Sequence, residues 1–205
     1  MGYLYTSVLI GCLTFLTAGS KAAQFDLIIR NGTIYDGSGT APVVGDVAIN
    51  RDSIAAVGKL ADARGKTEID AKGLAVAPGF INMLSWATES LIQDGRSQSD
   101  IRQGVTLEVM GEGESLGPLN EQMKKEMREA QGDIQFDIPW TTLGQYLEHL
   151  VKRGVSCNVA SFVGATTVRI HELGYADRSP TVAELERMKN LVRQAMEEGA
   201  LGVGS

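Results

Sequence analysis

Residues 75–86 read Ala-Val-Ala-Pro-Gly-Phe-Ile-Asn-Met-Leu-Ser-Trp, an apolar run that meets Pro78-Gly79 early in its course. Apolar residues dominate and alternate poorly with polar ones, which is typical of a strand buried on both faces, as in a parallel sheet. The residues before this run predict short strands and turns, and those after it alternate between predicted strands and helices. Such repetition indicates parallel βα units, so we predict an α/β fold.

The overall composition is that of an ordinary globular protein. The 205 residues include 43% hydrophobic and 21% charged residues, enough for one medium domain or for a small domain plus part of a larger one. The net charge of −6 gives no electrostatic basis for binding nucleic acid. We therefore predict no nucleic-acid partner.

The N-terminal segment predicts export. Residues 3–18 are mostly apolar and uncharged, and small residues follow them around Ser20 and Ala23. This pattern predicts a signal peptide over residues 1–23, cleaved between about Ser20 and Ala23, and an exported protein, either periplasmic or secreted. Two alternatives are a lipoprotein-type attachment at Cys12 and an uncleaved anchor. Only in the uncleaved case do we expect association with a membrane.

Residues 25–75 predict a small β unit. The run 25–30 is a predicted strand that ends at Asn31-Gly32, a dipeptide that favours a hairpin turn. A second hairpin is predicted at residues 50–52, between strands at 45–49 and 53–57.

The rest of the chain predicts alternating strands and helices. Asn120 is a predicted N-cap for a polar surface helix that runs to Ala130. Thr141 or Thr142 is the predicted cap of a helix with an apolar stripe, and Thr181 with Glu184 forms a predicted capping box. The predicted strands of this region cover residues 105–110, 156–163 and 200–204.

Two short motifs carry a resemblance to a known family. Pro-Gly-Phe-Ile at residues 78–81 and Ser-Leu-Gly-Pro-Leu at residues 115–119 resemble motifs of the amidohydrolase superfamily, in its D-aminoacylase (N-acyl-D-amino-acid deacylase) branch. The resemblance implies the N-terminal part of a small β-sandwich over residues 24–75, completed by strands from the C-terminal end of the chain, and a (β/α)8 barrel that begins at residue 76. A complete barrel needs roughly 250 residues, so residues 76–205 are expected to form its first half. We therefore expect the chain to be the front portion of a longer protein.

The resemblance also locates a metal site. Where the family has an Asp and two metal-binding His on the first barrel strand, this chain has Asn82, Leu84 and Trp86. Counting back from Ser115 places Glu112 at the family's metal-binding Cys, and a carboxylate can replace a thiolate on zinc. The resemblance thus implies one zinc ion with Glu112 as a ligand and the other ligands beyond residue 205. The alternative for Glu112 is a solvated loop acid.

The positions of three further polar residues near predicted strand ends indicate where their side chains lie. Glu108 has the same parity as Glu112, and both are expected to face the barrel interior, whereas Glu114 is expected to be a solvated loop acid. In the family, the region around Arg169 lines the substrate site, so Arg169 is a candidate for binding a substrate carboxylate in a bidentate manner. A structural ion pair is the alternative for Arg169.

The histidine and cysteine residues offer no site of their own. His149 lies off the apolar stripe of its predicted helix and is expected to face solvent. His171 falls in a stretch that is predicted to be irregular, and the spacing of the two histidines makes no metal site. Cys157 is interpreted as a small buried hydrophobe in a strand.

Together these features predict a metal-dependent hydrolase of non-peptide C–N amide bonds, similar to N-acyl-D-amino-acid deacylases and using a metal-activated water. The expected partner is a small N-acylated amino acid or a related amide. The alternative is a catalytically inactive relative that serves as a binding or structural protein. The sequence leaves open the acyl group, the amino acid, its stereochemistry and the oligomeric state.

Overall fold

A computed structural model describes residues 24–205, which divide into two compact units between Pro78 and Gly79. The signal peptide predicted over residues 1–23 lies outside the described residues. Within residues 24–205, no helix is both long enough and apolar enough to cross a membrane.

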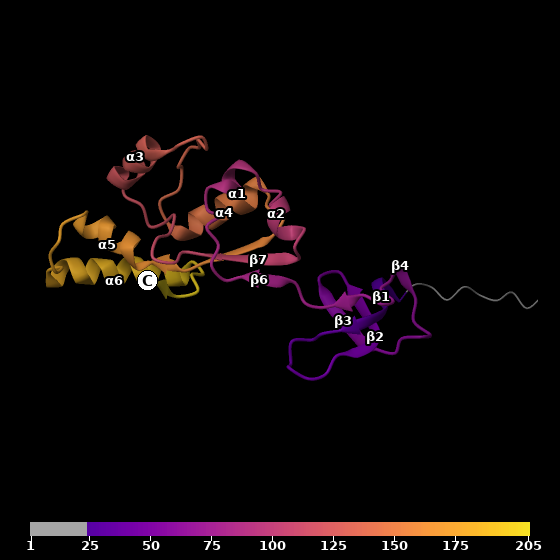
Figure 1. Cartoon of the computed structure of the whole chain (residues 1–205). Coiled ribbons are helices and arrows are strands. Elements are labelled where there is room, and N and C mark those ends of the chain that lie inside the picture. Colours follow the sequence, from indigo (N-terminus) through magenta and orange to yellow (C-terminus); the bar gives the residue numbers. More distant parts are fainter. Residues whose placement is uncertain (1–23) are drawn as a thin grey trace, which may run out of the picture. The chain divides into compact units, whose positions relative to one another are not determined.

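The first unit is one five-stranded sheet (Figure 1). Its strands are β1 (Phe25–Ile34), β2 (Val43–Asn50), β3 (Ser53–Gly58), β4 (Gly65–Asp70) and β5 (Ala75–Val76). The order is β3-β2-β1-β4, and β5 also pairs with β1. Strands β1, β2 and β3 are antiparallel neighbours, whereas β4 and β5 run parallel to β1. Residues 24–78 thus form a single sheet, and the sandwich, whose remaining strands were expected from the C-terminal end of the chain, stays a prediction.

The two predicted hairpins have different outcomes. The turn at residues 50–52 is confirmed, with Arg51 at a φ of 55° between β2 and β3. The hairpin at Asn31-Gly32 is wrong, because β1 continues through it as an irregularity in its pairing with β2. Asn31 takes a φ of 59° there, and a Cβ on Gly32 would collide with the side chain of Val76. Close packing against β5 therefore explains this glycine better than a turn does.

The second unit alternates strands and helices. It contains β6 (Phe80–Asn82), α1 (Ser90–Gln93), α2 (Gln98–Ile101), β7 (Val105–Met110), α3 (Glu121–Ala130), α4 (Leu143–Arg153), β8 (Asn158–Ser161), β9 (Val163–Gly164), α5 (Ala165–Leu173), α6 (Val182–Glu197) and β10 (Val203–Gly204). Strands β6, β7 and β8 form a parallel sheet in that order, and β9 pairs in parallel with β10. Helices α1, α2 and α4 lie along one side of β6 and β7 (Figure 1).

Parallel strands separated by helices agree with the predicted α/β class. Within residues 79–205 the two short sheets do not close into a barrel. The barrel therefore stays a prediction.

The opening stretch 75–86 departs from its prediction. It forms two short strands in different sheets instead of one, because Pro78 has no N–H to donate and interrupts the pairing. Burial on both faces is also wrong, since Phe80 and Ile81 are 63% and 55% exposed.

The predicted helix starts are confirmed. Asn120 accepts a hydrogen bond from the Met123 N–H at the start of α3. Thr142 and Thr181 form complete capping boxes at the starts of α4 and α6. Most of the apolar stripe of α4 packs in the main core of this unit, with Leu143, Tyr146 and Leu150 at its centre, whereas Val151 at its end is exposed.

Helix α5 was not predicted. Its sequence is rich in β-branched residues, which favour strands, and its N-cap Gly164 supplies no side-chain cap. The predicted strand 156–163 instead forms the short strands β8 and β9, and the chain turns into α5 at Ala165. Arg169 and His171, expected past a strand end, therefore lie in a helix.

Candidate functional site

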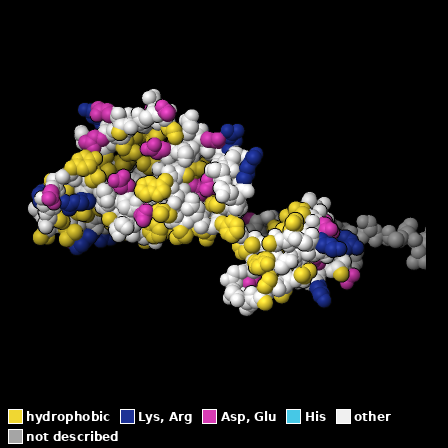
Figure 2. Space-filling model, viewed as in Figure 1, with side chains coloured by type: hydrophobic (Ala, Val, Ile, Leu, Met, Phe, Trp, Pro, Cys, Tyr) yellow, Lys and Arg dark blue, Asp and Glu magenta, His cyan; other side chains and the backbone are white. Residues whose placement is uncertain are grey.

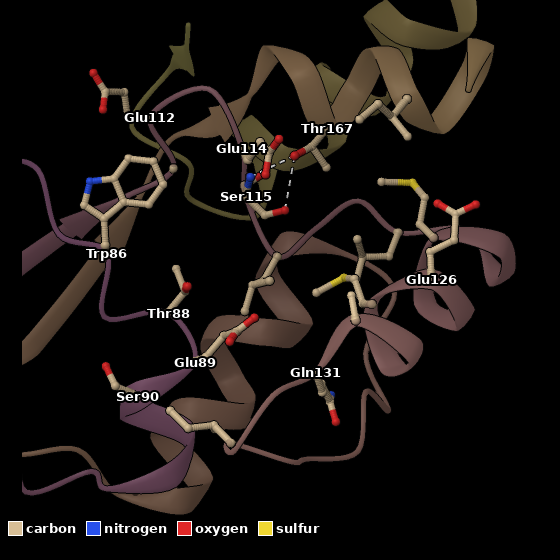
Figure 3. Close-up of a pocket in the computed structure, with 18 of the residues that line it drawn as sticks. Trp86, Thr88, Glu89, Ser90, Glu112, Glu114, Ser115, Glu126, Gln131 and Thr167 are labelled. Atoms are coloured by element: carbon tan, nitrogen blue, oxygen red, sulfur yellow. Dashed lines mark hydrogen bonds between the residues drawn. The ribbon is translucent and has the colours of Figure 1, made fainter. Parts of the chain in front are cut away.

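A cavity of about 640 Å³ lies at the carboxyl ends of β6 and β7 in the second unit (Figure 3). The loops after these two strands, with the start of α1, form one side of the cavity, and α3, α5 and the segments that follow these two helices contribute the rest of its lining. Ligand sites of parallel α/β folds occur at this end of the strands. This cavity is therefore the candidate functional site.

The loop after β7 is held by close backbone packing. Gly111 has a φ of 92°, and a Cβ there would collide with the carbonyl oxygen of Phe162. A Cβ on Gly164 would lie 2.5 Å from the Gly113 oxygen. The N–H of Thr166 donates to that same oxygen over 2.9 Å. The loop can follow this path only because glycine lets the backbones approach.

Two buried hydroxyl groups fix the same loop to α5. The Ser115 N–H donates to Thr167 Oγ1 over 2.8 Å, and the Thr167 hydroxyl donates back to the Ser115 carbonyl over 3.2 Å. Ser115 Oγ accepts from the Gly164 N–H over 2.9 Å and donates to the Gly117 carbonyl over 2.5 Å. Both side chains are buried, so the loop that carries Glu112 has a defined position.

Glu112 and Glu114 project from this fixed loop. Both are exposed and both line the cavity. Figure 3 shows Glu112 at the rim, near the ring of Trp86. Exposure leaves the Glu112 carboxylate available to a ligand, and it also fits the alternative of a solvated acid. The structure thus places Glu112 at a strand end, as predicted.

The loop after β6 presents apolar side chains where the family has metal-binding His. Leu84 is 51% exposed and Trp86 is 71% exposed, and Trp86 lines the cavity. Ser85 between them is buried, and its hydroxyl donates to Glu108 Oε2 over 2.6 Å. Neither an aliphatic chain nor an indole offers a lone pair to a metal ion.

Glu108 does not face the predicted barrel interior. Its side chain is fully buried on the side of the sheet that α2 covers. There Glu108 Oε1 accepts two hydrogen bonds, one from Ser97 Oγ over 2.8 Å and one from Cys157 Sγ over 3.0 Å. The parity with Glu112 is lost because the backbone turns at Gly111, whose φ is positive. Glu108 therefore joins the loop after β6 to the segments that precede α2 and β8, and the prediction of its direction was wrong.

Cys157 is buried, as predicted, but it also has a polar partner that the sequence did not indicate. Burial, together with the hydrogen bond to Glu108 and the charge of Glu108, raises the pKa of the Cys157 thiol to about 11. At neutral pH this cysteine is a protonated donor and not a nucleophile.

Helix α3 contributes to the cavity in a way that its polar sequence concealed. Met123 and Met127 line the cavity, although the helix was predicted as a polar surface element. On the same side, Tyr175 Oη donates to Glu126 Oε2 over 3.2 Å, and this bond with the charge of Glu126 raises the pKa of Tyr175. The sequence signal for this was the spacing of the two methionines, because residues four positions apart lie on the same face of a helix.

Arg169 lies in the second turn of α5. Its Nη2 donates to the carbonyls of Ala176 and Arg178 over 2.8 and 2.9 Å. It is not among the residues that line the cavity. Its binding to a substrate carboxylate stays a prediction, and its bonds in this structure go to the backbone of the loop that follows α5.

The two histidines lie apart from the cavity. The ring of His149 packs against Trp140, with ring centroids 4.9 Å apart, so the expectation that it faces solvent is wrong. His171 Nδ1 lies 3.2 Å from Glu172 Oε1 at the end of α5. Neither histidine lines the cavity.

The described residues do not fit a complete metal site. Within residues 24–205, no three His, Cys, Asp or Glu side chains are grouped so that they would hold a metal ion. A catalytic zinc ion needs about three protein ligands. At the cavity, the chain offers single exposed carboxylates such as that of Glu112.

Comparison with known proteins identifies close relatives. The chain is 34% identical to a D-aminoacylase and 33% identical to an N-acyl-D-aspartate deacylase, both of Alcaligenes xylosoxydans xylosoxydans. The matches cover 91% and 92% of this chain, and the chain spans 38% of the length of each relative. No protein-family model matches the chain.

Solved structures show the same relationship. A D-aminoacylase that defines a novel subset of amidohydrolases matches 87% of this chain with a TM-score of 0.74 at 32% identity, and the match covers 38% of that protein. D-aminoacylase at the same similarity is described as having a binuclear metal centre with one-metal activation and second-metal attenuation. The N-acyl-D-glutamate deacylase of Bordetella bronchiseptica, solved with zinc and a phosphonate inhibitor, matches with a TM-score of 0.75 at 27% identity over 87% of this chain and 38% of that protein. Over about nine tenths of its length the chain is thus similar to members of the D-aminoacylase branch of the amidohydrolase superfamily.

Proposed function

We propose that the protein hydrolyses the amide bond of an N-acylated amino acid, as a hydrolase of non-peptide C–N bonds. The observation that carries this proposal is the 34% identity to a D-aminoacylase over 91% of the chain. A cavity at the carboxyl ends of two parallel strands supports it, because this is where such folds build their sites. The barrel predicted from the sequence would complete the walls of that cavity.

We further propose that the protein uses a single zinc ion and that Glu112 is one of its ligands. A metal ion in such enzymes polarises the acyl carbonyl and activates water. The solved D-aminoacylase described as activated by one metal supports the choice of a single ion. The remaining ligands would have to come from outside the described residues.

The proposal is tested with Glu112→Gln in the complete protein, with Glu114→Gln as the matched control. Both changes remove one carboxylate from the same loop and keep its shape. We expect Glu112→Gln alone to lower the zinc content, measured by elemental analysis, together with the hydrolysis of an N-acetyl-D-amino acid. Equal zinc content in the two variants would make Glu112 an ordinary loop acid.

A catalytically inactive binding or structural protein is the second candidate function. The exposed Leu84 and Trp86 favour it, because they occupy the positions of the family's two metal-binding His. A complete protein that hydrolyses no N-acyl amino acid in the presence of zinc would establish this reading.

We also propose that the protein is exported and cleaved between about Ser20 and Ala23. The apolar segment followed by small residues supports this proposal. N-terminal sequencing of protein from the periplasm or the culture medium tests it. A mature protein that still begins at Met1 in the cytosol would contradict it.

A further inference from the structure

The cavity has one strongly apolar side. We call this side the apolar wall and define it by Leu119, Met123, Met127, Ala130 and Ile134, all of which line the cavity. Met123, Met127 and Ala130 follow one another at intervals of four and three residues on one face of α3. Figure 2 shows apolar side chains in a hollow of this unit, with carboxylates around its rim.

The opposite side of the cavity is polar. Glu112 and Glu114 line it beside the exposed Trp86, and in Figure 3 Glu126 and Gln131 stand across the cavity from them, at the margin of the apolar wall. No Lys, Arg or His belongs to the cavity lining. The strand ends of β6 and β7 are on this polar side, so a scissile amide would lie here and one of its substituents would extend toward α3.

We propose that the apolar wall binds the acyl group of the substrate and that the preferred substrates are amino acids with a medium-length or long aliphatic N-acyl group. This inference rests on the proposed function for the identity of the ligand as an N-acyl amino acid. The acyl group is the substituent shared by the substrates named in the relatives, whereas the amino acid differs between aspartate and glutamate. The acyl group is therefore the better match for the five apolar side chains of this wall.

The size of the cavity agrees with a long acyl group. At roughly 30 Å³ for a group of the size of water, an acetyl group fills about 60 Å³ and a decanoyl group about 300 Å³. The cavity measures about 640 Å³, so an acetyl group would fill only a small part of it, whereas a longer chain would also cover the partly exposed Met127 and Ile134. Met123 and Met127 are flexible enough to follow chains of different length.

The test measures hydrolysis and binding as a function of acyl length. The complete protein is assayed with the N-acetyl, N-butyryl, N-octanoyl and N-decanoyl derivatives of D-leucine. Each buried methylene strengthens binding up to about fourfold, so we expect the decanoyl derivative to bind at least tenfold more tightly than the acetyl derivative in calorimetry. Met127→Gln places a polar group on the apolar wall and should weaken binding more as the acyl group lengthens.

The matched control is Met196→Gln, an equal change at a half-exposed position of α6 that does not line the cavity. It should bind all four derivatives like the unmodified protein. Thermal melting of both variants separates a loss of binding from a loss of folding. Equal effects of Met127→Gln and Met196→Gln would overturn the inference.

The other outcomes separate the inference from the proposed function. Hydrolysis that does not depend on acyl length would overturn the inference and leave the proposed function standing. Affinity that grows with the amino-acid side chain at constant acetyl would also overturn it. Tight binding of the decanoyl derivative that depends on Met127, without hydrolysis of any derivative, would support the inference and count against the proposed function.

Discussion

The loops that follow the neighbouring strands β6 and β7 differ in how they are held. The loop after β7 is fixed by glycines at backbone contacts and by the buried Ser115 and Thr167 hydroxyls. The loop after β6 is held by one buried hydrogen bond, from the hydroxyl of Ser85 to Glu108. Leu84 and Trp86, on either side of Ser85, are exposed. At this cavity, the loop after β7 is therefore fixed by buried contacts, whereas the loop after β6 exposes apolar side chains.

This difference bears on the proposed role of Glu112. A ligand that must be positioned to within a fraction of an ångström needs a side chain on a rigid support. Glu112 has such a support, whereas the positions of Leu84 and Trp86 carry no metal-binding group and little packing. The following predictions test the comparison.

The largest expected effect is that of Gly111→Ala. Gly111 combines a φ of 92° with no room for a Cβ beside Phe162, so the variant should lose roughly 4 kcal/mol of unfolding free energy. Gly113→Ala is the matched control, because Gly113 has a φ of 71° but open space around it and should lose only about 1 kcal/mol. Urea denaturation measures both. Equal losses would show that close backbone packing does not fix this loop.

Glu108→Ala should have the next largest effect. It leaves the Ser85, Ser97 and Cys157 donors without their acceptor in a buried place, at a cost of about 3 kcal/mol. Glu108→Gln keeps the shape and one carbonyl acceptor, so it should lose less than the alanine variant. The two free energies of unfolding are compared by denaturation in urea. A neutral Glu108→Ala would mean that the β6 loop does not depend on this carboxylate.

Thr167→Val should cost about 2 kcal/mol, because it leaves the buried Ser115 N–H without its acceptor. Thr167→Ser keeps the hydroxyl and should recover most of this loss. Urea denaturation measures the stability of both variants, and hydrogen exchange at Ser115 reports the bond itself. If valine and serine behaved alike, packing and not the hydrogen bond would fix the β7 loop.

Local signals in the sequence predicted much of this unit. The strand at residues 105–110 was placed at its observed bounds. Asn120 and Thr181 were identified as caps, and Thr142 was one of two candidates, because the hydrogen bonds of a cap close within three residues. Helix α5 was missed because its stability comes from contacts with distant elements, such as the bonds of Thr167 to Ser115. Such long-range bonds leave no pattern in a single sequence.

The candidate site could be predicted only in part. The position of Glu112 at a strand end followed from a motif, because strand and loop are contiguous in the chain. The direction of Glu108 and the role of α3 did not, since both depend on which elements pack together. Counting parity from Glu108 to Glu112 failed because Gly111 turns the backbone between them.

The pKa of Cys157 reports on the burial of Glu108, which binds both Cys157 and Ser85 of the β6 loop. The pKa of this thiol is about 11 in the folded protein and near 9 in an unfolded chain, so below pH 9 the thiol is protonated in both states. Its contribution to stability is fully present there and is lost as pH rises toward 11. We expect negligible reaction with a disulfide reagent at pH 8 and a steep rise only above about pH 10. Glu108→Gln removes the neighbouring charge and should lower this pKa. Rapid labelling of the folded protein at pH 8 would show that Cys157 and Glu108 are open to solvent.

The smallest expected effect is that of Trp86→Ala, on the exposed side of the β6 loop. Trp86 is 71% exposed, so its removal should change the unfolding free energy by less than about 0.5 kcal/mol. The chain has two tryptophans, and the other one, Trp140, is 2% exposed, so the emission that remains in the variant should resist quenching by acrylamide. The unmodified protein should show one accessible and one protected fraction. A large loss of stability, or full protection of both tryptophans in the complete protein, would mean that another part of the protein covers Trp86. The loops after β6 and β7 would then be equally well packed.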